Sequence, residues 1–509
     1  MERFMTRFDL PGYDLHWSEY PGHYSEKDWT PLIQLVSKLA HLKSIHYAVA
    51  NSFPRSLLDA VHHHHPSCEI NIWSPQCLRL DIPIVNQKYT FNAFRQPNRV
   101  YNDTLDMEII QSPCLRAIKI DYPLFLGSDG AFQPHSIIHH VSQAPSLKHI
   151  YLRLDSDWGI RFMAAIRNLP DKKVFMKWNQ TLDFTTLRSL NLPRIECPSL
   201  FKDAASGFTS LERLAICVAP GRFGWAQISA DLHCAFRYLR PLKYLSIGAL
   251  EDVLFLHNVL ERHGPSLMGL MLEPYESGVS RTSPPLKPEY CGCRYPFLDH
   301  EHLHRIAEHF QNLKVLRVPI RRSKGSEEEV RTYRSLSQFP QLQNLILDLY
   351  GNPRPVLSRE EGQYSDEGLG DMIPVHVSLK DAFINFAVDR DLATAIWKEI
   401  FLHQPSRRLL RLRISPWGFD IFSWEEIYVF LQLAGSFLVT HGGNKVVEIG
   451  REERRAEQEA IAEEDEFEDR RPFRVPRRIT QILHSIWQPV SSDTDWTTSW
   501  RSFPLQTDV

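Results

Sequence analysis

Leu187-Arg188-Ser189-Leu190-Asn191-Leu192 is one copy of a phrase that recurs along the chain: Leu, two residues, Leu or Ile, one residue, and a final aliphatic residue. Alternation along a strand places Leu190 and Leu192 on the side that faces the core, with Leu187 at the entry. The other clear copies begin at Leu115, Leu147, Leu211, Leu242, Leu267, Leu313, Leu342 and Leu409.

Amphipathic segments with helical spacing lie between these copies. Examples are residues 29–40 and residues 253–263, and Gly264-Pro265 closes the second as a helix stop. The first leucines of neighbouring copies lie about 24 to 46 residues apart, except for the longer gap between Leu342 and Leu409, and this spacing leaves room for one strand and one helix in each unit. We therefore predict an α/β leucine-rich-repeat solenoid of irregular repeats, with a parallel sheet on the concave face and helices on the convex face.

Loss of the repeat spacing after Thr440 predicts three regions in the 509 residues. Residues 1–28 are a lead-in, residues 29–440 the solenoid, and residues 441–509 a charged tail that is partly helical or disordered. Arg, Glu and Asp dominate residues 451–471, which is why we expect little packed core there.

Composition favours a protein of the cytoplasm or nucleus. The net charge of −3 provides no general attraction for nucleic acid or anionic membrane. Eight cysteines in a chain of this length are too sparse for a secreted disulfide scaffold. The most apolar stretch, residues 427–440, is interrupted by Gln432 and Gly435 and is shorter than the roughly 20 residues that a membrane span needs. We expect neither a nucleic-acid nor a membrane partner.

Two further segments carry a family resemblance. Residues 56–72 combine a helix, His65-Pro66 and a short strand, and residues 379–397 form a later helical module. With the irregular repeats between them, they resemble the leucine-rich-repeat proteins of filamentous fungi that are known as F-box proteins. The resemblance spans roughly residues 25–440. It implies a substrate-recognition subunit of a cullin ubiquitin ligase, bound through its F-box to a Skp-type adaptor.

The F-box itself is not evident in the sequence. Asp9-Leu10-Pro11-Gly12 contains the Leu-Pro of such a domain but lacks the acidic residue and the helical run that should follow. Either an upstream exon is missing, or the protein has no F-box. The alternative function is therefore a stand-alone leucine-rich-repeat scaffold or inhibitor without a ubiquitin role.

No enzymatic motif is present. The chain lacks Gly-x-Ser-x-Gly, the phosphate-binding Gly-x-x-x-x-Gly-Lys-Ser/Thr, Gly-x-Gly-x-x-Gly and His-Glu-x-x-His. We predict no catalytic residue, no cofactor and no enzymatic activity. A remote alternative is a hydrolase whose site lies in the inserts at residues 273–296 or 352–366, because loops can carry catalytic groups.

Two histidine clusters are candidate metal ligands. His62 to His65 precede Cys68, but consecutive helical residues point in different directions and rarely converge on one ion. Cys291 and Cys293 precede His300, His302 and His304, a softer donor set that suits zinc. No second cysteine pair follows at the usual distance, so a surface loop and a polar helix start are favoured, and we predict no metal site.

The residues between the leucines form the candidate binding face. The position after the first Leu is often basic, and stacked strands would align such residues in a ladder about 4.8 Å apart. Such a ladder predicts an acidic or phosphorylated protein ligand, with aromatic and Arg side chains as anchors. The predicted binding residues are Lys148, His149, Tyr151, Arg153, Arg188, Lys243, Tyr244, Lys314, Arg317, Arg411 and Arg413.

Overall fold

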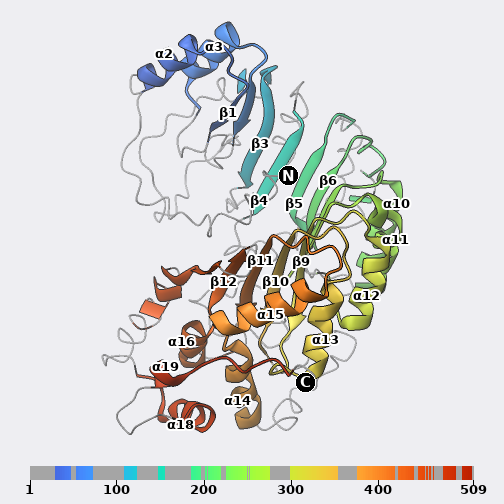
Figure 1. The fold of residues 1–509 in the computed structure, drawn as a ribbon. Coiled ribbons are helices and arrows are strands. Elements are labelled where there is room, and N and C mark those ends of the chain that lie inside the picture. The colour runs from blue at the N-terminus through green and yellow to red at the C-terminus, as the bar shows by residue number, and fades with distance from the viewer. Residues whose placement is uncertain are drawn as a thin grey trace, which may run out of the picture. The chain divides into compact units, whose positions relative to one another are not determined.

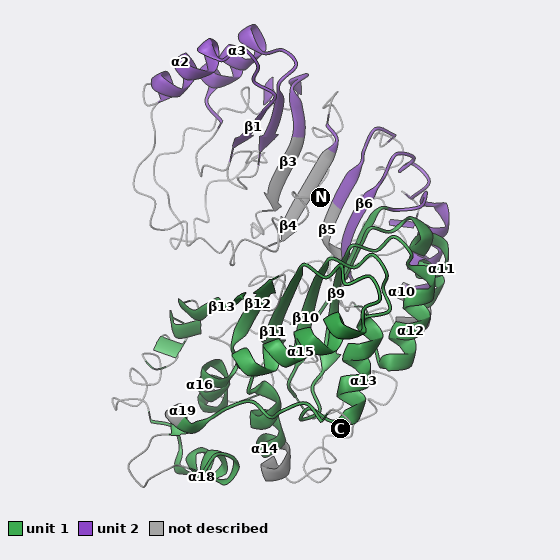
Figure 2. Ribbon diagram, viewed as in Figure 1, with its two compact units in different colours: residues 1–11, 243–509 green, residues 12–242 purple. Residues whose placement is uncertain are grey.

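The protein is an α/β protein with a mixed sheet. The computed structural model describes, with short breaks, residues 29–47, 53–72, 108–122, 147–154, 185–195, 201–218, 225–274, 298–352, 375–418, 422–440, 445–462, 474–488 and 496–506. The chain forms two compact units (Figure 2). Unit 2 comprises residues 12–242, and unit 1 comprises residues 243–509 with residues 1–11.

Unit 2 is built on parallel strands that pair in chain order. They are β1 (Ser44–Tyr47), β2 (Glu69–Ile72), β3 (Leu115–Tyr122), β4 (His149–Leu154), β5 (Ser189–Ile195) and β6 (Arg213–Val218). The register aligns equivalent residues of the recurring phrase, so that Ile150 lies opposite Leu190 and Leu190 opposite Leu214. The leucines of successive copies therefore stack on one another inside the unit.

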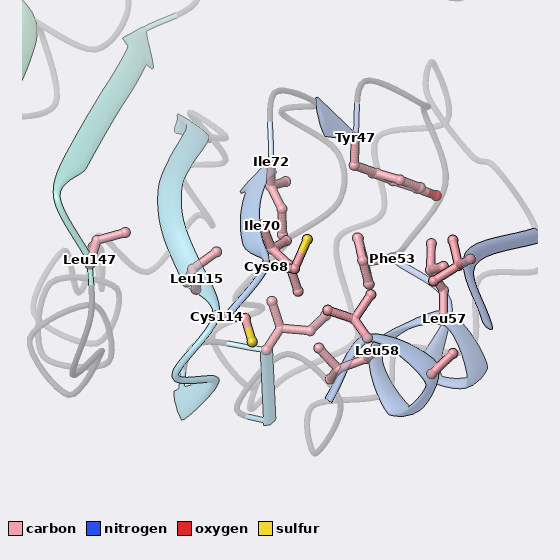
Figure 3. Close-up of a cluster of buried hydrophobic side chains, with 14 residues drawn as sticks. Tyr47, Phe53, Leu57, Leu58, Cys68, Ile70, Ile72, Cys114, Leu115 and Leu147 are labelled. Atoms are coloured by element: carbon pink, nitrogen blue, oxygen red, sulfur yellow. The ribbon is translucent and has the colours of Figure 1, made fainter. Parts of the chain in front are cut away.

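The described part of unit 2 contains the helices α2 (Thr30–Lys38), α3 (Arg55–His64) and α10 (Trp225–Tyr238). Helices α2 and α3 contribute to a buried cluster that Figure 3 shows in part. Phe53 and Leu57 pack with Cys68 and Ile70 in one buried cluster (Figure 3). Burial raises the pKa of the Cys68 thiol to about 11, so this cysteine is a protonated, apolar part of the core.

Unit 1 contains parallel strands that end in an antiparallel extension. Strands β7 to β11 pair in parallel and in chain order, whereas β12 and β13 continue the sheet antiparallel to their neighbours. Their bounds are β7 (Tyr244–Gly248), β8 (Gly269–Glu273), β9 (Val315–Arg321), β10 (Asn344–Tyr350), β11 (Arg411–Trp417), β12 (Ser436–Thr440) and β13 (Lys445–Ile449). Residue 440 is thus the last residue of β12, which pairs with β13.

Helices alternate with the strands of unit 1 (Figure 1). Those between β7 and β11 are α11 (Val253–His263), the short 3-10 helix η5 (Gly264–Ser266), α12 (His300–His309), α13 (Glu327–Leu336), α14 (Val375–Phe386) and α15 (Arg390–His403). The predicted helix at residues 253–263 is confirmed, together with its stop at Gly264-Pro265. Asp299, Ser326 and Asp389 cap the first turns of α12, α13 and α15 by accepting a backbone N–H.

Helix α16 (Trp424–Leu433) precedes residue 440. The predicted tail then adds the helices α18 (Arg477–Ile486) and α19 (Trp496–Ser499) to unit 1. Ile479 and Leu483 of α18 are fully buried in a cluster with Phe383 and Phe430. Much of the tail that the structure describes is therefore packed against α14 and α16. Among the described residues, no helix combines the length and apolarity needed to cross a bilayer.

Candidate functional site

The position after the first Leu forms a continuous backbone row in unit 2. The N–H of Lys148 donates to the carbonyl of Arg116 (2.8 Å), that of Arg188 to Lys148 (3.1 Å), and that of Glu212 to Arg188 (2.9 Å). Three cationic residues therefore occupy the same position in three adjacent repeats, at or just before the start of β3, β4 and β5. We call Arg116, Lys148 and Arg188 the basic row.

The equivalent row of unit 1 is less basic. It runs through Lys243, Met268, Lys314, Gln343 and Leu410, again with each N–H donating to the preceding carbonyl at 2.7–2.9 Å. Met268 separates the two lysines, and a neutral residue follows them. The sequence predicts basic residues at this position along the whole chain. In the structure, consecutive basic residues occupy it only in the described part of unit 2.

The side chains of the predicted row differ in exposure. Arg188 and Lys243 are exposed, whereas Lys148 and Lys314 are half-buried. The other predicted residues of unit 2 occupy β4, but the side chains of His149, Tyr151 and Arg153 lie outside the described residues. Lys148 and Arg188 are consequently the members of the predicted set that best define a site in unit 2.

Unit 1 carries a second polar arrangement, which we call the charged zigzag. Arg317 on β9 donates from Nε to Asp348 Oδ2 (2.7 Å) and from Nη2 to Asp348 Oδ1 (3.2 Å) on β10. Its Nη1 lies 3.7 Å from Glu273 Oε1 on β8, and the Ser246 hydroxyl on β7 donates to the same Glu273 oxygen (3.1 Å). Arg413 on β11 contributes a further positive charge beside Asp348. Opposite charges therefore alternate across neighbouring strands.

Burial dominates the electrostatics of the zigzag. The Asp348 side chain is only 4% exposed, whereas that of Arg317 is 25% exposed. Burial raises the pKa of the Asp348 carboxyl, although Arg317 acts in the opposite direction as a nearby cation and hydrogen-bond donor. The pair holds Arg317 in one orientation, and desolvation of the carboxylate limits its contribution to stability.

This raised pKa predicts a pH-dependent difference between the natural protein and Asp348→Asn. As pH falls from 7 toward the ordinary aspartate value of 3.8, folded Asp348 takes up its proton before the unfolded chain does. The stability of the natural protein should therefore improve relative to Asp348→Asn as the solution becomes more acidic. Urea unfolding of both proteins at pH 7 and pH 4.5 measures this difference. A shift that favours the Asn variant at pH 4.5 would contradict the prediction.

The sequence prediction that the residues between the leucines face solvent is wrong for much of unit 1. Tyr244, a predicted binding residue, is only 4% exposed, and Met271 and Ile346 on the same strand face are also buried. The ring of Tyr244 extends over Gly269 on β8, where an added Cβ would lie 2.7 Å from the Tyr244 Cδ1 atom. A strand buried on both faces has continuous apolar runs, as in Leu345-Ile346-Leu347.

The remaining predicted residues lie on β11. Arg411 is exposed and Arg413 is half-buried, so both are more accessible than Tyr244. Sequence reasoning missed Glu273 and Asp348, the acids that order Arg317. A signal for them exists, since each acid directly follows the last leucine of its copy, as Leu272-Glu273 and Leu347-Asp348.

The histidine clusters do not converge in the structure. His62 pairs with the Ser112 hydroxyl (2.7 Å), and His65 with the Val36 carbonyl (2.7 Å). His302 pairs with Asp299 (2.7 Å), whereas His304 pairs with Gln338. In the part of the chain that the structure describes, no three His, Cys, Asp or Glu side chains are arranged to hold a metal ion. The other candidate ligands, Cys291 and Cys293, lie outside it.

Comparison with known proteins finds no family model and no curated protein sequence that matches this chain.

Proposed function

We propose that this chain is a non-enzymatic leucine-rich-repeat scaffold whose strands present a binding face for a protein ligand. The observation that carries the proposal is the register of the recurring phrase. Within each unit, equivalent residues of successive copies lie on adjacent parallel strands and form rows. Repeats that stack in this way provide extended surfaces, because each strand adds one residue to every row.

The ligand that best fits the basic row is acidic or phosphorylated. Lys148 and Arg188 directly precede the neighbouring strands β4 and β5, and like charges at this spacing repel each other unless an anion lies between them. An acidic segment that runs across the strands would meet one cation at each step. Arg411 and Arg413 extend the set of candidate contacts in unit 1.

The resemblance to F-box proteins suggests the biological role. In this role the chain would be a substrate-recognition subunit of a cullin ubiquitin ligase, and a Skp-type adaptor would bind through an F-box. The alternative is a stand-alone scaffold or inhibitor that uses the same face. Affinity purification of the tagged protein from its own cells, followed by mass spectrometry, separates the two. Recovery of the adaptor supports the ligase role, and recovery of ligand without it supports the scaffold.

Charge reversal tests the binding face directly. We expect Lys148→Glu combined with Arg188→Glu to weaken capture of the recovered ligand by about tenfold or more, because two attractive contacts become repulsive. Lys380→Glu combined with Lys398→Glu is the matched control, since both lysines are exposed on helices α14 and α15. Quantitative mass spectrometry of captured ligand measures the effect. Equal capture by the natural protein and the strand variant would remove the basic row from the proposal.

A further inference from the structure

An extended segment of unit 1, residues 501–506, is held along its length by residues distant in the sequence. We call this segment the strap. The Trp487 indole N–H donates to the Arg501 carbonyl (2.8 Å). The N–H and hydroxyl of Ser502 donate to the two oxygens of Asp389 (2.8 and 2.6 Å). The N–H of Gln506 donates to the Gly325 carbonyl (2.7 Å). Backbone groups at both ends of the strap therefore form hydrogen bonds with other residues of unit 1.

The two main partners are themselves rigidly placed. Asp389 caps α15 by accepting the N–H of Leu392 (2.9 Å), which holds its carboxylate beside the strap. Gly325 adopts a φ of 74°, and a Cβ there would lie 2.5 Å from the Pro504 carbonyl oxygen. A side chain at position 325 would therefore both strain the backbone and exclude the strap.

An aromatic anchor completes the arrangement. Phe503 packs against the aromatic core cluster of unit 1, with its ring centroid 6.4 Å from that of Trp487. Main-chain hydrogen bonds and one inserted aromatic side chain are the usual elements of recognition of an extended peptide. The strap thus contacts the rest of unit 1 as a bound peptide contacts its receptor.

We propose that the surface formed by Asp389, Gly325, Trp487 and the adjoining aromatic cluster, the strap site, is a docking site for extended segments of partner proteins. The strap is its resident occupant. The partner segment carries an unmodified Ser or Thr followed by an aromatic residue, because Asp389 requires an N–H and an O–H donor at that position. This surface acts independently of the basic row, and each can fail without the other.

The chemistry of Asp389 determines the specificity. A phosphoserine in place of Ser502 has lost the hydroxyl proton and adds a charge of about −1.5 to −2 next to a carboxylate. The strap site therefore rejects phosphorylated segments, whereas the basic row favours them.

The resident strap competes with any added peptide, since a tethered segment has an effective concentration in the millimolar range. The full-length chain with Ser502→Asp weakens this competitor, because it places a second carboxylate against Asp389. Ser499→Asp is the matched control, since the Ser499 hydroxyl bonds within its own helical turn to the Trp496 carbonyl. The probe is a fluorescent peptide with the sequence of residues 498–507, measured by fluorescence anisotropy.

We expect Ser502→Asp to bind this peptide at least about tenfold more tightly than the natural chain or Ser499→Asp. The reason is that the competing strap of Ser502→Asp has lost a charge-assisted hydrogen bond. The same peptide phosphorylated at Ser502 should bind about tenfold more weakly. Adding Asp389→Asn to Ser502→Asp should abolish the gain. Asn caps a helix as well as Asp does, so α15 should keep its first turn.

Hydrogen exchange at the amides of Ser502 and Gln506 shows whether the strap has been released. Faster exchange in Ser502→Asp without tighter peptide binding would overturn the proposal, because the vacated surface would then be only a structural contact. Unchanged exchange would overturn it as well, since Asp389 would not hold the strap. Equal or tighter binding of the phosphorylated peptide would refute the specificity.

Discussion

Replacing Glu329 by Gln is expected to lower the free energy of unfolding by about 3–5 kcal/mol, the usual effect of removing one partner of a buried ion pair. The Glu329 and Arg322 side chains are both fully buried and lie 2.8 Å apart. Burial disfavours the charged guanidinium, but the Glu329 carboxylate, together with smaller contributions from Tyr333 and Asp389, offsets this effect and raises the pKa of Arg322. Without that carboxylate, a charged Arg322 would remain in the core.

The other bonds of Glu329 make the amide a poor substitute. Its carboxylate accepts hydrogen bonds from the Tyr333 hydroxyl (2.8 Å) and from the backbone N–H groups of Ser323 (2.6 Å) and Gly325 (2.9 Å). A Gln side chain has one oxygen and one NH₂ group, so its NH₂ group would face hydrogen-bond donors whichever way the amide is oriented. The variant therefore loses acceptors for the loop as well as the charge.

Urea unfolding followed by circular dichroism measures this effect. Glu328→Gln is the matched control, because Glu328 is exposed on the same turn of α13 and should change stability by less than about 0.5 kcal/mol. A Glu329→Gln protein as stable as this control would show that the buried pair contributes little.

Replacing Gln404 by Leu should lower the free energy of unfolding by about 3 kcal/mol, roughly 1 kcal/mol for each lost hydrogen bond. The Gln404 side chain is buried and bonds only to backbone groups in the described contacts. Its amide nitrogen donates to the carbonyls of Phe339 and Leu342 (both 3.2 Å), and its oxygen accepts the N–H of Leu409 (2.9 Å). Leu would remove the Gln404 partner from all three groups, and of these the Phe339 carbonyl would still accept the N–H of Leu342 (3.3 Å).

The same denaturation measurement applies to this variant. Gln311→Leu is the control, since Gln311 is exposed and its amide nitrogen donates to the carbonyl of Glu308, three residues earlier, at 3.4 Å. We expect that control to remain within about 0.5 kcal/mol of the natural protein. If the free energy of unfolding of Gln404→Leu equals that of Gln311→Leu, solvent must provide hydrogen bonds to the three backbone groups.

The strands and several helices could be predicted because their signals are local. The leucine phrase places its last two apolar residues on one side of a strand, and Leu345 and Leu347 are indeed buried. The helix at residues 253–263 ends where Gly264-Pro265 stops it. Such patterns depend on residues a few positions apart, so the chain's local sequence is sufficient to specify them.

The outward side of the strands could not be predicted in the same way. Alternation separates two faces but does not say whether the second face meets solvent. Tyr244 illustrates the difference, because its burial depends on the absence of a side chain at Gly269, on the neighbouring strand. Ile346 is buried beside Met271 for a similar reason, as a member of a non-local cluster.

The sequence by itself determined the repeating strands, their leucine core and the helix stops, since each arises from short-range periodicity. Only the tertiary structure decided which polar groups meet. Residues 321–329 are rich in charged side chains, yet Arg322 and Glu329 are buried there as a pair. Arg317 donates to Asp348, which lies 31 residues away in the sequence, and Asp389 accepts from Ser502, which lies 113 residues away. Such pairs depend on which segments become neighbours, and long-range packing sets that.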